Sequence, residues 1–154
     1  MRAWQVAVFA GAVALALILG ALFFQYVLNF PPCEMCHWQR WPHIAAACIG
    51  LGGGVMMRSA KSSLTLPLAA LTLLLVAASG AIGVYHAGVE WHWWQGPTAC
   101  TTGYVFTGTL DLNAPVPHCD IAAWRLFGIS MAGYNAVISL TAAAFGAFLL
   151  AKKS

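Results

Sequence analysis

Two cysteines, Cys33 and Cys36, are separated by two residues within the stretch 31–43, PPCEMCHWQRWPH. A C-x-x-C pair closes a very small ring, and such pairs tend to hold a cysteine of low pKa. A thiolate is both the attacking species and the better leaving group in thiol–disulfide exchange. Arg40, four residues after Cys36, adds a permanent positive charge that favours thiolate, while Glu34 opposes it. This spacing therefore indicates redox chemistry.

Two further cysteines, Cys100 and Cys119, lie nineteen residues apart in the second half of the chain. With the first pair they are compatible with a redox relay, or with structural disulfides that only brace loops. Residues 33–37 also match C-x-x-C-H, the attachment signature for c-type haem. A zinc site fits least, because Cys100 and Cys119 lack the paired spacing of a zinc knuckle. The spacing alone leaves the redox, structural and haem interpretations open.

The elements that must position these cysteines are membrane helices. Of 154 residues, 61% are hydrophobic and only 7% are charged, whereas a soluble domain carries about 25% charged residues. The length allows one domain, residues 1–154. The first apolar run is longer than the core of a signal peptide and is expected to stay as an uncleaved helix. The pattern predicts an all-α, integral-membrane four-helix bundle with helices at about 4–24, 41–57, 64–85 and 126–151.

The charges predict how these helices are oriented. With four crossings, most basic residues fall on one side, which is cytoplasmic by the positive-inside rule. All four acidic residues fall on the other side, in two outer loops at about 27–40 and 86–125. Both termini are then cytoplasmic, and both cysteine pairs lie in the outer loops, on the exterior of a bacterial inner membrane or in an equivalent lumen, where disulfides persist. The basic residues of the inner side are Arg2, Arg58, Lys61, Lys152 and Lys153.

The combination of these features resembles a known family. Its specific parts are Pro32-Cys33-x-x-Cys36 with Arg40 four residues on, followed by Cys100 and Cys119 in the second outer loop. Further parts are Cys119-Asp120, then Trp124, then the stretch 128–135, GISMAGYN. On these residues the chain resembles the disulfide bond formation protein B (DsbB) family of bacterial inner-membrane thiol–quinone oxidoreductases, over nearly its whole length.

The resemblance implies a mechanism. A reduced periplasmic thiol oxidase of the DsbA type is expected to attack the Cys100–Cys119 disulfide, so that Cys100 forms the mixed disulfide. Cys119 then exchanges with Cys33. Cys36, as thiolate, is expected to face a quinone, either ubiquinone or menaquinone, which leaves as quinol.

Two residues are expected at that quinone. Arg40 matches the quinone-site arginine of the family, and a guanidinium can hydrogen-bond a quinone oxygen and stabilise its developing charge. His86 lies in the region where some members place a histidine near the quinone. An interfacial histidine bonded to backbone or water is the alternative for His86.

The sequence also predicts positions or roles for three other polar residues. His43, one turn after Arg40, is expected on the helix surface, with a role as proton carrier as the alternative. His118, beside Cys119, would favour a thiolate there if protonated. Asn135, in the last helix, predicts an interhelical hydrogen bond.

Overall fold

The computed structural model describes residues 2–58, 63–97, 100 and 118–152. Lys61, Lys153 and, in the second predicted outer loop, residues 98–99 and 101–117 lie outside the described residues. In chain order, the elements are α1 (Ala3–Tyr26), α2 (Glu34–Ala47), the π-helix η1 (Cys48–Gly53), α3 (Gly54–Met56), α4 (Thr65–Glu90), β1 (Arg125–Leu126), β2 (Ile129–Ser130) and α6 (Met131–Ala151).

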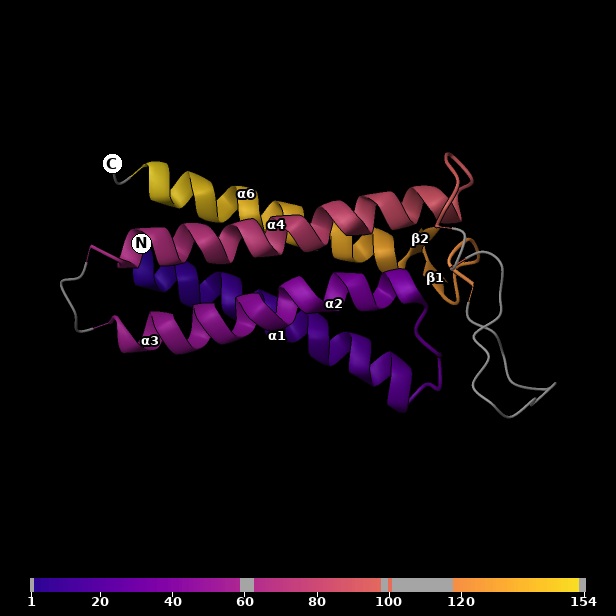
Figure 1. Cartoon of the computed structure of the whole chain (residues 1–154), viewed down its shortest axis with the longest axis horizontal. Helices are drawn as coiled ribbons and strands as arrows, with labels where there is room; N and C mark the ends of the chain where they lie inside the picture. The colour runs from indigo at the N-terminus through magenta and orange to yellow at the C-terminus, as the bar shows by residue number, and fades with distance from the viewer. Residues whose placement is uncertain (1, 59–62, 98–99, 101–117, 153–154) are drawn as a thin grey trace.

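The long helices run side by side, as Figure 1 shows. Among the described residues, α1, α4 and α6 are long and apolar enough to cross a membrane. α2, η1 and α3 form one continuous helical run over residues 34–56, which at about 1.5 Å per residue is ~34 Å long, enough for a bilayer core of about 30 Å. The expected mostly helical membrane protein is confirmed. Both termini lie at one end, and the β1–β2 hairpin lies at the other, called here the loop end (Figure 1).

The second helix begins at Glu34 rather than at about residue 41, so Arg40 is in a helix and not in a loop. Cys33 caps this helix: its sulfur accepts the backbone N–H of Cys36 at 3.2 Å, and Glu34 suits the positive first turn. Pro42 lies in the helix interior. Proline there removes a backbone hydrogen bond, and in membrane helices neighbouring side chains often satisfy the freed groups.

Glycines let the second helical run approach α1 closely. A Cβ built on Gly50 would lie 2.9 Å from the Cα of Gly11 and 2.8 Å from Cγ2 of Thr72. Neither the backbone of α1 nor the branched threonine can yield to such a contact. A Cβ on neighbouring Gly52 would meet nothing within 4 Å. Gly50 is therefore a packing residue, as small residues often are between membrane helices.

The two later helices also differ from the predicted bounds. α4 extends to Glu90 rather than ending near residue 85, and α6 begins at Met131 rather than at 126. Ser130 caps α6 by accepting the backbone N–H of Gly133 at 3.2 Å. The residues before it form a two-stranded hairpin, whose turn holds Phe127 and Gly128 at φ 49° and 81°. Such positive φ values suit a two-residue hairpin turn and exclude a helix.

Candidate redox site

The two cysteine pairs meet in one buried group at the loop end, called here the cysteine cluster. Cys100 and Cys119 form a disulfide. Cys119 is fully buried, and Cys100 is only 4% exposed. The pairs therefore share one environment, although a stretch of more than sixty residues separates them along the chain. The cluster consists of Cys33, Met35, Val89, Cys100 and Cys119, with Cys36 packed against it.

The first pair is set at the start of α2. The Cys33 and Cys36 sulfurs lie 2.7 Å apart. Cys33 is buried, whereas Cys36 is half-buried. The hydrogen bond to the Cys36 side chain, and then burial, raise the pKa of the Cys33 thiol well above its usual range. The proton of the pair therefore stays on Cys33, and the negative charge falls on Cys36, near the N-terminus of the helix and one turn from Arg40.

His86 reaches this pair from α4. Its Nε2 lies 3.6 Å from the Cys33 sulfur and 3.7 Å from Oε1 of Glu90, while its Nδ1 lies 2.8 Å from the amide nitrogen of Gln39. The residue is only 3% exposed, so His86 lies inside the bundle and not on its outer surface. The ligand atoms of Cys33, Cys36 and His86 lie within 4.8 Å of one another. Two cysteines and a histidine are ligands that soft metals accept. The spacing of the cysteines in the sequence did not indicate this donor set, because His86 comes from another helix.

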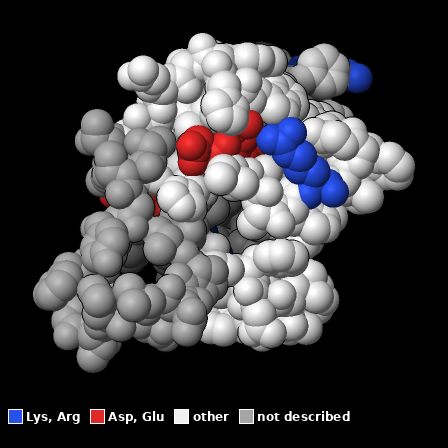
Figure 2. Space-filling model, turned by 90° about the vertical axis from the view of Figure 1, so that its right-hand side faces the viewer, with Lys and Arg blue, Asp and Glu red and all other residues white. Residues whose placement is uncertain are grey.

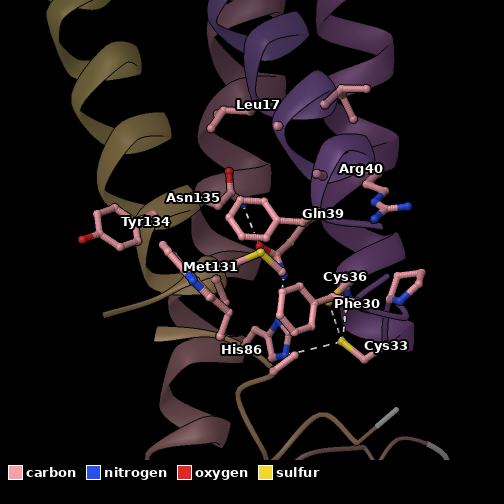
Figure 3. Close-up of a pocket in the computed structure, with 18 of the residues that line it drawn as sticks. Leu17, Phe30, Cys33, Cys36, Gln39, Arg40, His86, Met131, Tyr134 and Asn135 are labelled. Carbon is pink, nitrogen blue, oxygen red and sulfur yellow. Dashed lines mark hydrogen bonds between the residues drawn. The ribbon is translucent and has the colours of Figure 1, made fainter. Parts of the chain in front are cut away.

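A cavity of about 590 Å³ opens beside these groups, within the size range of small-molecule sites. Figure 2 views the loop end directly: a hollow lies within a mostly uncharged surface, below neighbouring acidic and basic side chains. Figure 3 shows Cys36, Arg40 and His86 around the cavity. Its apolar wall comes from α1, the segment before α2, and α6, including Leu17, Ala21, Phe24, Phe30, Met131 and Ile138.

Arg40 lines this cavity from α2. One guanidinium nitrogen, Nη1, donates to the side-chain oxygen of Gln25 in α1 at 2.6 Å. A guanidinium has five N–H donors, so this bond fixes the head group and leaves donors for a ligand. The geometry brings four of the six residues predicted for the site together around one cavity: Cys33, Cys36, Arg40 and His86.

The expectation that His43 lies on the helix surface is wrong. The side chain is 3% exposed, and its Nε2 lies 2.8 Å from the side-chain oxygen of Asn135. It is buried because α2 begins early and turns the face bearing Met35, Gln39 and His43 inward. The interhelical hydrogen bond predicted for Asn135 is confirmed, since the residue joins α6 to both α2 and α4.

His118 does not reach a cysteine sulfur through any hydrogen bond found in the described residues. Its Nδ1 lies 4.0 Å from Asp120 Oδ1, and both side chains are partly exposed. Its predicted effect on Cys119 stays a prediction.

Sequence reasoning missed two residues that touch His86. Gln39 was expected in a loop, and Glu90 was grouped with the other outer acids. The i, i+4, i+8 spacing of residues 35, 39 and 43 is the signal that could have placed Gln39 on a buried helix face. Glu90 follows His86 by four residues on α4, which is the spacing of facing side chains.

Comparison with known proteins agrees with this geometry. The family model described as Disulfide bond formation protein DsbB matches residues 2–149. A Disulfide bond formation protein B of Aromatoleum aromaticum is 26% identical over 92% of this chain and 89% of its own length. One of Verminephrobacter eiseniae is 30% identical over 78% and 70%, and an uncharacterised Rickettsia prowazekii protein is 23% identical over 75% and 69%. No solved structure matches the chain. With four cysteines gathered in one cluster and a family match over nearly the whole length, the chain belongs to the DsbB family of disulfide bond formation proteins.

Proposed function

We propose that the chain is a protein-disulfide:quinone oxidoreductase of the bacterial inner membrane. It reoxidises a periplasmic dithiol oxidase of the DsbA type and passes the electrons to membrane quinone. The observation that carries this proposal is the cysteine cluster, in which both pairs lie against each other and beside an apolar cavity. A structural brace would not need its disulfide next to a second, unbridged pair.

Electrons enter through the second pair. A partner thiolate attacks Cys100, the Cys100–Cys119 bond breaks, and Cys119 leaves as a thiolate. In the oxidised enzyme Cys33 and Cys36 are joined in a disulfide; Cys119 attacks Cys33, the Cys33–Cys36 bond breaks, and Cys36 leaves as a thiolate. The second partner cysteine displaces Cys100, whose thiolate attacks Cys119 and releases Cys33 as a thiolate. The partner is then oxidised, the Cys100–Cys119 bond is restored, and Cys33 and Cys36 hold two electrons.

The cavity has the properties that a quinone ring requires. It is large enough, mainly apolar, and carries a few polar groups at one end. When bound, a quinone supplies an acceptor for two electrons and two protons. Arg40 donates hydrogen bonds to a ring oxygen and stabilises negative charge there, while Cys36 presents its sulfur from the start of α2. Cys33, which takes up a proton after its release, closes the disulfide with Cys36, and that proton goes to the quinol that leaves.

The proposal includes a membrane orientation. Four helices cross the bilayer as a single-domain bundle, both termini are cytoplasmic, and both cysteine pairs are periplasmic. It is supported by the grouping of Arg2, Arg58 and Lys152 at the end of the molecule that holds both termini. A quinone dissolved in lipid then reaches the cavity between α1 and α6, while a soluble partner reaches the loop end.

The test is turnover by the purified protein in detergent with a reduced DsbA-like oxidase and ubiquinone or menaquinone, followed by quinone absorbance. Serine at any one of the four clustered cysteines should abolish turnover. Cys48→Ser is the matched control, because Cys48 is an exposed free cysteine on η1, and it should keep full activity. Full activity in any of the four other variants would contradict the relay. A covalent chromophore after denaturation would instead support c-type haem.

A further inference from the structure

A chain of hydrogen-bonded amides links α6 to His86, and two backbone carbonyls orient it. The side-chain nitrogen of Asn135 lies 3.2 Å from the Ser79 backbone oxygen and 2.7 Å from Oε1 of Gln39. A carbonyl oxygen only accepts, so the Asn135 amide must turn its nitrogen toward Ser79. Its oxygen then accepts from the Ser139 hydroxyl at 2.8 Å.

The orientation of Asn135 passes to Gln39. Because Asn135 donates to the Gln39 oxygen, the Gln39 nitrogen faces the other way, toward the backbone oxygen of Met35 at 3.2 Å and Nδ1 of His86 at 2.8 Å. Reversing both amides would set oxygen against oxygen at the Met35 and Ser79 carbonyls. The two N–H groups of Gln39 are therefore used by Met35 and His86, and Nδ1 is an acceptor (Figure 3).

A neutral imidazole that accepts at one nitrogen carries its proton on the other. We propose that Gln39 and Asn135 are positioning residues that hold His86 with its proton on Nε2, so that His86 donates a hydrogen bond to the Cys33 sulfur and does not accept its proton. Both neighbours of Nε2 are acceptors: the Cys33 sulfur at 3.6 Å and Oε1 of Glu90 at 3.7 Å.

This inference rests on the proposed function for its chemical purpose. Cys33 leaves as a thiolate when the Cys100 thiolate attacks Cys119 and the Cys33–Cys119 bond breaks. Burial makes a thiolate at Cys33 unfavourable, and a preset N–H donor offsets this cost without any proton changing place. The same tautomer keeps the Nε2 lone pair from ligating a metal with Cys33 and Cys36, despite their proximity.

Gln39→Glu tests the assignment because it changes an amide donor into an acceptor of the same shape. The carboxylate accepts from Nδ1–H, which moves the ring proton from Nε2 to Nδ1, as carboxylates do behind metal-binding histidines. Glu34→Gln is the matched control, because it makes the reverse exchange at an exposed position of the same helix.

The measurement is nitrogen NMR of the full-length protein labelled with 15N-histidine in detergent, with the His86 signals assigned by their loss in His86→Gln. We expect a protonated Nε2 and a bare Nδ1 in the wild type and in Glu34→Gln, and the reverse in Gln39→Glu. A wild-type ring protonated at Nδ1 would overturn the inference, whether or not the variants fold, and so would an unchanged pattern in a folded Gln39→Glu.

Turnover gives a second readout. Gln39→Glu should lower kcat about tenfold or more, the scale of outer-shell effects on a histidine. An unchanged kcat would refute the role at Cys33. The NMR result does not require turnover, so an inactive wild type would count against the proposed function and leave the tautomer assignment standing.

Discussion

Replacing Arg40 by methionine removes its charge and its donors while keeping much of its length. Arg40 is half-buried and lines the cavity, and its guanidinium is fixed by Gln25 at 2.6 Å. The side chain therefore loses little conformational freedom when a ligand binds. A hydrogen bond from a charged group contributes about 1.5–3 kcal/mol. We take the loss as ~2 kcal/mol. Because each loss of about 1.4 kcal/mol weakens binding tenfold, the apparent KM for quinone should rise about 30-fold.

The assay is steady-state quinone reduction at saturating reduced partner, and then partner titration at saturating quinone. The KM for the partner should stay within about twofold. Gln25→Leu leaves the charge but frees the head group, so it should raise the quinone KM less, about fivefold for ~1 kcal/mol. An unchanged quinone KM in Arg40→Met would refute the reasoning and remove Arg40 from the site.

The remaining predictions concern the thiols and the helix packing. In reduced protein carrying Cys48→Ser, iodoacetamide at neutral pH should label Cys36 before Cys33, because the raised pKa keeps Cys33 protonated; mass spectrometry showing Cys33 labelled first would contradict that order. Gly50→Ala should destabilise the folded protein by about 1–3 kcal/mol, the usual cost of overpacking, and lower its Tm in detergent. Gly52→Ala should not lower Tm, because its Cβ has open space; equal Tm values for the two variants would refute the close approach.

The family and the coarse fold could be predicted from the sequence, because both depend on local signals. Charge depletion and four apolar runs indicate a membrane protein without tertiary information. The start of α2 was missed because the charge of Arg40 was taken as the helix boundary, whereas the Cys33 sulfur caps the helix earlier. That shift alone explains why His43 was expected at the surface.

The residues around His86 could not be predicted in the same way. Gln39, Glu90 and Asn135 come from three helices, and their contacts depend on how those helices pack. A single sequence records the polar residues but not their partners. Only the family resemblance, and not the spacing, pointed to His86.

The burial of the Cys100–Cys119 disulfide limits which thiols can reduce it. Both cysteines are less than 5% exposed, and attack on a disulfide requires access along the sulfur–sulfur axis. A small reductant that collides with the surface therefore finds no sulfur to attack. Under the proposed function, only a partner that binds the loop end and exposes these sulfurs can react, so oxidising power reaches that recipient and is not lost to other thiols.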